Sequence, residues 1–172
     1  SAGTTLTTGV QNTLIGGLAG DAITDANNNT AVGYAALSTN QRGAYNVAVG
    51  VGALQTHNPS GAANTYNTAV GFDAGNAVTT GVENTLIGGL YESVGISALG
   101  SDTLGSRNVA IGGSSLNQQN FTTATDTYNT AVGYNTGYAI TTGIRNTILG
   151  GQAGDALIDA DDNTAVGALS LS

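Results

Sequence analysis

The sequence predicts an all-β fold, a parallel β-solenoid (β-roll) built from 17-residue repeats. The segment Asn-Thr-Ala-Val-Gly, or a close variant of it, recurs along the whole chain. A glycine stands at the same place in every repeat, and no apolar pattern with the period of a helix persists. Seventeen residues of extended chain are about 56 Å long, enough for one turn of a narrow coil. We therefore expect residues 1–172 to form a single repeat domain with one repeat in each turn.

The repeats begin at regular places along the chain. Nine of them start at an asparagine, namely Asn12, Asn29, Asn46, Asn67, Asn84, Asn108, Asn129, Asn146 and Asn163. The spacing between successive starts is 17, with two exceptions of 21 and one of 24. The spacings of 21 follow Asn46 and Asn108 and indicate four-residue insertions in these two repeats.

The spacing of 24, which follows Asn84, is interpreted as 7 plus 17, because 94–99 align with 32–37. Tyr91 then begins a tenth repeat, and the turn near 84–93 is irregular. Partial repeats stand at both ends, and the chain begins at Ser1 without Met. We therefore expect a chain that is processed, excised or incompletely represented, and a fibre or an excised fragment is favoured over a free monomer.

The composition excludes several classes of function. The chain has 27 Gly, one Pro and no Cys, Met or Trp, and its net charge is -8 with three Lys or Arg residues in all. This charge repels phosphate backbones and anionic lipid, so we expect no nucleic acid partner. No apolar run approaches the roughly 18 residues of a spanning helix, and we expect no membrane insertion. The absence of Cys excludes disulfides and thiolate metal sites.

Individual repeat positions, numbered from 1 at the asparagine, indicate their structural roles. Position 5 is Gly in all ten aligned repeats, which predicts a corner with positive φ or a very close neighbouring backbone. Position 4 is always aliphatic, as at Val70 and Ile111, and is interpreted as the inward residue of a short strand. Position 1 is Asn in nine of the ten repeats, which predicts a ladder of stacked amides.

Positions 9 and 12 compensate for each other in volume. Position 9 is Leu where position 12 is polar, as in the pair Leu116 and Gln119. Position 9 is Gly where position 12 is aliphatic, as in Gly20 and Ile23. Because close packing conserves volume, we expect both positions to face a common interior, beside a small residue at position 8.

The interior of each turn is thin, and this predicts an assembly. Apolar side chains at positions 3 and 6 need another surface, most economically that of identical chains. Those at position 6 include Tyr34, Phe72, Ile96 and Tyr134. A stack without caps also leaves open edges. We therefore expect an elongated homotrimeric fibre.

The repeat units carry a resemblance. Residues 29–45 read NTAVGYAALSTNQRGAY and are followed by Asn-Val-Ala-Val-Gly at 46–50. Such units resemble the NTAVGY-type repeats of bacteriophage tail fibre proteins and, more distantly, the head repeats of YadA-like trimeric autotransporter adhesins. The resemblance covers essentially the whole chain and implies a homotrimer of parallel β-rolls. The insertions and the loss of residues after Leu90 depart from the family pattern.

The resemblance implies a structural fibre protein, the shaft or a host-contacting segment of a phage tail fibre, located in the virion. The alternative is a segment of a bacterial cell-surface trimeric adhesin, extracellular, that binds a host surface or glycans. Expected partners are other copies of the chain, other tail or fibre proteins, and a host glycan or receptor. We expect no enzymatic activity, no cofactor and no metal.

The two insertions are the candidate receptor-contact loops, since extra residues leave the stacking plane and such loops commonly form a binding face. They lie within 55–66 and 117–128, in the same repeat type, so we expect them on one side of the coil. Four turns would separate them by about 19 Å. The candidate contact residues, all expected to be exposed, are His57, Asn58, Asn120 and Phe121. Leu54 and Leu116 are expected to be buried.

Other polar groups have competing interpretations. His57 is the sole histidine and nothing marks a triad around it, so a solvated loop is favoured over catalysis. Several aspartates could ligate Ca²⁺ but lack the spacing of an EF-hand loop, so a solvated face is favoured. These aspartates are Asp21, Asp25, Asp155, Asp159, Asp161 and Asp162.

Two columns of side chains are also ambiguous. Tyr45, Tyr66 and Tyr128 could form a glycan-stacking strip, but burial between turns or chains is favoured for a recurrent position. The threonines at position 2 resemble those of ice-binding solenoids in a general way, but Val47 and Val109 interrupt the column.

Overall fold

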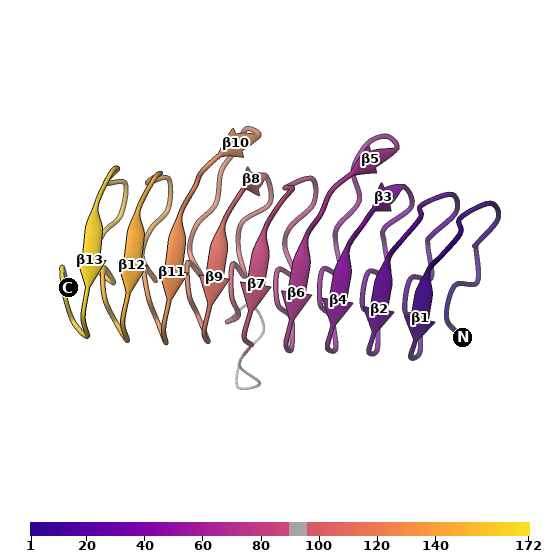
Figure 1. The fold of residues 1–172 in the computed structure, drawn as a ribbon, viewed down its shortest axis with the longest axis horizontal. Coiled ribbons are helices and arrows are strands. Elements are labelled where there is room, and N and C mark those ends of the chain that lie inside the picture. Colours follow the sequence, from indigo (N-terminus) through magenta and orange to yellow (C-terminus); the bar gives the residue numbers. More distant parts are fainter. Residues whose placement is uncertain (90–95) are drawn as a thin grey trace.

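The computed structural model of the chain describes residues 1–89 and 96–172. These residues form a parallel β-solenoid without helices, which confirms the predicted fold class. Nine strands lie side by side in one sheet, one strand from each turn (Figure 1). In sheet order they are β1 (Thr13–Ile15), β2 (Thr30–Val32), β4 (Val47–Val49), β6 (Thr68–Val70), β7 (Thr85–Ile87), β9 (Val109–Ile111), β11 (Thr130–Val132), β12 (Thr147–Leu149) and β13 (Thr164–Val166).

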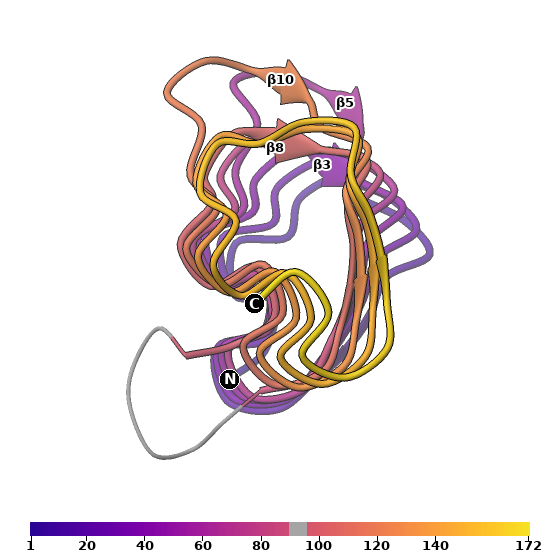
Figure 2. The ribbon, with the colours of Figure 1, turned by 90° about the vertical axis from the view of Figure 1, so that its left-hand side faces the viewer.

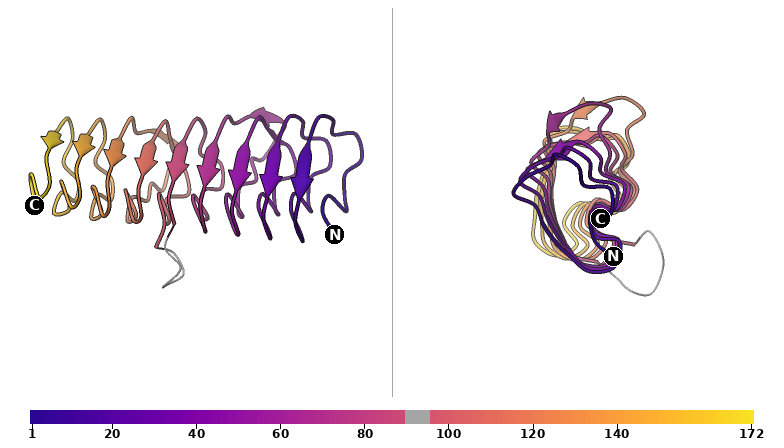
Figure 3. Two further views of the ribbon diagram at one scale, coloured as in Figure 1. Left: turned by 60° about the horizontal axis from the view of Figure 1, so that its bottom comes forward. Right: turned by 90° about the vertical axis from the view of Figure 1, so that its right-hand side faces the viewer.

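Neighbouring strands are parallel and in register, so like positions of the repeat stack on one another. In the first pair, Thr13 lies opposite Thr30 and Ile15 opposite Val32. The view along the coil in Figure 2 shows the turns superimposed, and Figure 3 shows the row of strands from a further side (left) and the coil from its other end (right). The repeat period of the sequence is thus the period of the coil.

The segment after Asn84 forms one long turn and not two. Strand β7 pairs directly with β9, with Thr85 opposite Val109, which leaves no place in the sheet for a strand between them. The interpretation of this spacing as 7 plus 17, with a tenth repeat that has its own strand, is therefore wrong, because β7 and β9 are neighbours in the sheet. The first five residues of the proposed tenth repeat, 91–95, lie outside the described ranges, among them Tyr91, Val94 and Gly95.

Position 3, and not position 4, points into the coil. Ala31, Ala69 and Ala131 at position 3 have no exposed surface, whereas Val70 at position 4 is 36% exposed and Val166 is 66% exposed. The prediction for position 4 is therefore wrong, as is the prediction that position 3 needs a second surface. The inward residue of position 3 is alanine in six strands and Leu14, Leu86 or Ile148 in the other three, whereas the aliphatic residues of position 4 lie on the outer face.

The core is completed by positions 8, 9 and 12, as predicted. Leu54 and Leu116 at position 9 and Ile23 at position 12 are fully buried, as are the alanines of position 8. A Cβ on Gly20 would lie 2.9 Å from Ile23 Cδ1 and 2.6 Å from Leu14 Cδ2. Positions 9 and 12 therefore share one volume, and position 3 of some turns contributes to it.

The asparagines of position 1 form the predicted amide ladder. The Asn29 Oδ1 atom accepts hydrogen bonds from the backbone N–H of Asn46 at 2.9 Å and from its Nδ2 at 3.1 Å. The Asn29 Nδ2 donates to the carbonyl of Gly43 at 3.0 Å. The buried amide of Asn29 therefore joins its turn to the next and also closes its own turn, which satisfies groups that burial would otherwise penalise.

Candidate functional site

The two insertions form loops that add short strands to the solenoid. The first insertion loop, 58–64, contains β5 (Ala63–Asn64), which pairs with β3 (Gly43–Ala44) of the preceding turn. The second insertion loop, 120–126, contains β10 (Thr125–Asp126), which pairs with β8 (Gly105–Ser106). Both loops project beyond the stacked turns from the same edge (Figures 1 and 2), as expected.

The distance between the two loops is shorter than expected. Because 84–107 is a single turn, the loops belong to turns that lie three apart and not four. At the spacing of neighbouring strands this separates them by about 14 Å along the coil.

The four candidate contact residues differ in exposure. Asn120 is exposed, as predicted, and Asn58 is half-buried. His57 is fully buried and Phe121 is 7% exposed, so the prediction that these two side chains face solvent is wrong. His57 is buried because it still follows the repeat pattern, at position 12, before the first insertion loop begins. Phe121 is buried within the second insertion loop, where its backbone N–H is bonded to the buried Asp102. The residues that follow Phe121, 122–124, are exposed.

His57 occupies position 12 of its turn, in the volume that aliphatic residues fill in other turns. Neither ring nitrogen has a hydrogen-bond partner, and a Cβ on Gly43 would lie 3.1 Å from His57 Nε2 and 3.2 Å from Pro59 Cδ. Burial lowers the pKa of His57 from 6.5 to about 4, and the nearby Thr79 carbonyl offsets a part of this effect. The imidazole is therefore neutral at pH 7 and serves here as a packing group.

Gln119 occupies the equivalent position in the second insertion turn and is bonded on both sides. Its Nε2 donates to Asp102 Oδ2 at 2.6 Å and to Asn108 Oδ1 at 3.1 Å, and its Oε1 accepts from Asn129 Nδ2 at 2.7 Å. The other oxygen of Asp102 accepts the backbone N–H of Phe121 at 3.3 Å. This network ties the start of the second insertion loop to the preceding turn.

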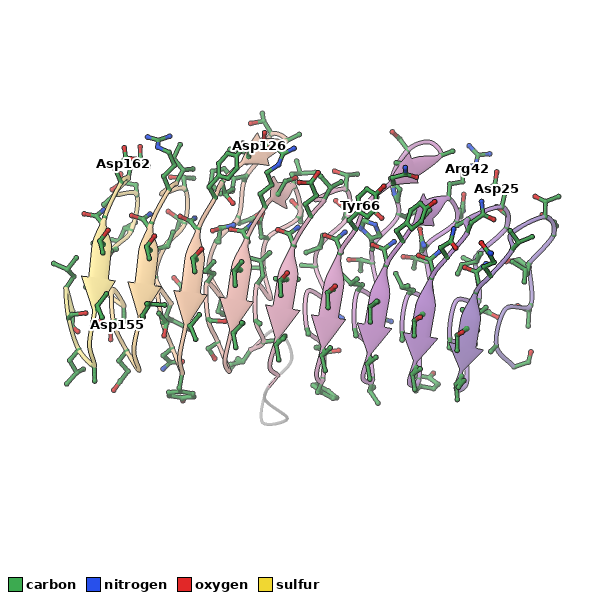
Figure 4. All side chains as sticks on the ribbon, viewed as in Figure 1. Asp25, Arg42, Tyr66, Asp126, Asp155 and Asp162 are labelled. Carbon is green, nitrogen blue, oxygen red and sulfur yellow. The ribbon has the colours of Figure 1, made fainter. Side chains whose placement is uncertain are left out.

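The edge that carries the loops also carries the ion pairs. Arg42 lies 3.8 Å from Asp25, and Arg145 Nε lies 2.6 Å from Asp162 Oδ1 (Figure 4). Arg107 pairs with Glu83 at 3.0 Å and also with Asp126. The hydrogen bond from Arg145 lowers the pKa of Asp162, since it stabilises the carboxylate. These pairs are exposed and contribute little to stability.

The tyrosines at the last position of their repeats lie on the same edge and are not buried within the chain. Tyr45, Tyr66 and Tyr128 are 44% to 53% exposed, so the favoured prediction of burial between turns is wrong. The rings of Tyr45 and Tyr66 stack with centroids 5.1 Å apart, and the Arg107 guanidinium lies 5.7 Å from the centroid of Tyr128. One face of each ring is thus covered by a neighbouring tyrosine or by Arg107, and that face is not free to stack on a glycan.

The aspartates considered for Ca²⁺ do not converge. Among the described residues, no group of three or more His, Cys, Asp or Glu side chains could hold a metal ion. Asp161 accepts the backbone N–H of Ile144 at 2.8 Å, and Asp21 accepts from Thr4, so these carboxylates bond to the neighbouring turn. Asp155 lies away from the loop edge (Figure 4).

The outward face of the nine-stranded sheet is uncharged. Side chains of positions 2 and 4 point outward because position 3 points inward. Along the nine strands position 2 is Thr or Val, and position 4 is Val, Ile or Leu. The position 4 residues that are 36% to 66% exposed are Ile15, Val70, Ile87, Leu149 and Val166. Sequence reasoning missed this face because it placed position 4 in the core. The available signal was that position 4 is aliphatic in every strand.

Residues 1–89 and 96–172 form no pocket. The same ranges contain no helix long and apolar enough to cross a membrane. Comparisons with protein family models, with curated proteins and with solved structures found no match. The exposed sheet face and the loop edge are therefore the candidate functional surfaces.

Proposed function

We propose that this chain is a non-enzymatic segment of a homotrimeric structural fibre, such as the shaft or a host-contacting part of a phage tail fibre in the virion. The partners in the assembly are other copies of the chain and other tail or fibre proteins. The solenoid fold supports a structural role, since stacked turns build a long rigid body from little sequence information.

One observation carries the proposal, namely the aliphatic column of position 4 on the uncharged sheet face. Soluble monomers rarely expose a long contiguous apolar surface, and such surfaces mark interaction sites. Nine strands make this face about 38 Å long. The net charge of -8 resides elsewhere on the chain, so copies that meet through this face bring no like charges together. Three sheets around a common axis would cover the column.

A charge placed on the sheet face tests the proposal. Val70→Asp and Leu149→Asp each put a carboxylate at an exposed position 4, and each should convert a trimer to monomers while the circular dichroism spectrum is retained. Gln118→Asp is the matched control, because Gln118 is exposed and only its backbone takes part in a hydrogen bond. Trimers that persist in both face variants would contradict the proposal.

A second candidate function is attachment of a bacterial surface adhesin, or of the fibre itself, to a host receptor or glycan. The observation that favours it is the protrusion of both insertion loops from one edge, about 14 Å apart. Asn120 and the exposed residues that follow Pro59 and Phe121 supply the contacts, while His57 supports the loop from within.

Deletion of the loops tests this second function. Removal of 59–62 and 121–124 restores the regular repeat period in both turns and should preserve the solenoid. If the loops make the contact, binding to cells or to a glycan array is lost while the oligomeric mass stays the same. Undiminished binding by the double deletion would place recognition elsewhere.

A further inference from the structure

The buried imidazole of His57 supports the first insertion loop, but neither proposed function uses its ability to bind a proton. It has no exposed surface, and both ring nitrogens lack hydrogen-bond partners. In the equivalent turn, Gln119 fills the same position and all its polar atoms are bonded. The first insertion loop therefore begins over an unpartnered ionisable group, and the second over a saturated amide.

The surroundings of His57 offer no counter-charge. The ring lies beside 40–43 of the preceding turn, Thr79 of the following turn and Pro59 of its own loop. Arg42 is the sole charged side chain in these segments, and it is half exposed and faces Asp25. No carboxylate there could stabilise an imidazolium, so protonation would leave an uncompensated buried cation.

The anchor of the loop lies beside the ring. The backbone N–H of Asn58 donates to the carbonyl of Thr79 at 2.8 Å, and this bond holds the first residue of the loop on the next turn. The same carbonyl is near enough to affect the pKa of His57, although neither ring nitrogen meets it in hydrogen-bond geometry. An imidazolium would need this carbonyl as its acceptor and would compete with Asn58 for it.

We propose that His57 is an acid-sensitive latch: the neutral imidazole holds the first insertion loop against the solenoid, and protonation of the ring releases the loop. Release lets the imidazolium reach water, at the cost of the Asn58 to Thr79 hydrogen bond and the β3 to β5 pairing. The second insertion loop has no buried imidazole, and the buried carboxylate at its base, Asp102, has hydrogen bonds to both oxygens, so this loop stays closed. The latch concerns the stability of the loop itself, so it stands whether or not the loop contacts a partner.

Amide hydrogen exchange at pH 7 and pH 4, with rates corrected for the chemical effect of pH, tests the latch. Because His57 has a pKa of about 4 in the closed loop and 6.5 in an open one, protection of 58–64 should fall on the order of 100-fold at pH 4. The second insertion loop is the internal control, and its protection should change far less. Equal losses in both loops, or no loss in the first, would overturn the proposal.

Two variants separate the latch from general acid sensitivity. His57→Asn copies the Leu37 and Asn40 pair of the preceding turn, and His57→Gln copies Gln119. Neither side chain titrates, so either variant should keep the first insertion loop protected at pH 4. A loop that still opens in acid without the imidazole shows that another group is responsible. If neither variant folds, the comparison between the two loops of the unchanged chain decides alone.

Discussion

Gly112 lies directly against Gly133 of the next turn, so closely that a Cβ on Gly112 would be 2.4 Å from the Gly133 carbonyl oxygen. The φ angle of Gly112 is +124°, outside the range that other residues readily adopt. Both causes proposed from the sequence for glycine at position 5, positive φ and close backbone, therefore apply together. The stacking of the turns depends on this corner.

Gly112→Val should lower the free energy of unfolding by about 3 kcal/mol or more, because it adds a clash with backbone to a strained φ. Thermal or urea denaturation measures the loss. Gly61→Val is the control, because a Cβ on Gly61 would meet no atom within 4 Å and Gly61 has no positive φ. The free energy of unfolding of this variant should therefore change little. Equal stability of the two variants would show that the corner imposes no such constraint.

Leu54→Gly should be rescued in part by His57→Leu in the same turn. Loss of a buried leucine lowers the free energy of unfolding by about 2 to 5 kcal/mol. Here the loss should be smaller by roughly 1 kcal/mol, because Leu54 has a left-handed φ of 49° that glycine adopts freely. The unpartnered His57 can be replaced without loss of a side-chain hydrogen bond, unlike Gln119. Strictly additive damage in a double-mutant cycle would show that positions 9 and 12 do not share a volume.

Asp102→Asn should destabilise the fold by about 1 to 3 kcal/mol in urea denaturation at pH 7. One carboxylate oxygen accepts from the backbone N–H groups of Gly105 and Phe121, and the other accepts from Gln119 Nε2. In either orientation of an asparagine amide, its NH2 group would face one of these donors and not an acceptor. Asp159→Asn, at an exposed position, is the control. A variant as stable as this control would mean that the network around Gln119 is not formed.

Acid should destabilise the chain through His57. Between pH 6.5 and pH 4 the unfolded chain binds a proton that the folded chain excludes, so the free energy of unfolding falls as pH decreases, by about 3 kcal/mol over this range. Urea denaturation at pH 7 and pH 4 should show a smaller fall for His57→Asn than for the unchanged chain. Identical falls would contradict the burial of a neutral imidazole.

The sequence sufficed for the period, the parallel stacking, the Asn ladder and the shared volume of positions 9 and 12. These features recur in every turn, so one physical reason per position accounts for them. Sequence reasoning failed where it had to decide which side of a strand faces the interior of the coil and which faces outward. Alternation in a strand places positions 2 and 4 on one face, and the aliphatic residues at position 4 were assigned to the core although position 3, which is alanine in six strands and leucine or isoleucine in three, points inward.

The candidate site was harder to predict, because it depends on where insertions leave the coil. The longer spacing after Asn46 or Asn108 locates an insertion but not its first protruding residue. His57 was therefore assigned to the surface although the repeat pattern continues through it, and Phe121 was assigned to the surface although it is buried within the second insertion loop. The left-handed φ of non-glycine residues, such as 63° at Tyr45, could not be predicted either, since it goes against the local preference of these residues.

The mass of the purified chain in solution, measured by multi-angle light scattering at micromolar concentration, tests the proposed assembly most directly. An uncharged aliphatic sheet face that meets two identical faces predicts a stable species of three times the 16.9 kDa chain mass. The trimer should survive dilution and high salt, because apolar contact holds it and ion pairs do not. A single species at 16.9 kDa would contradict the proposed trimeric fibre.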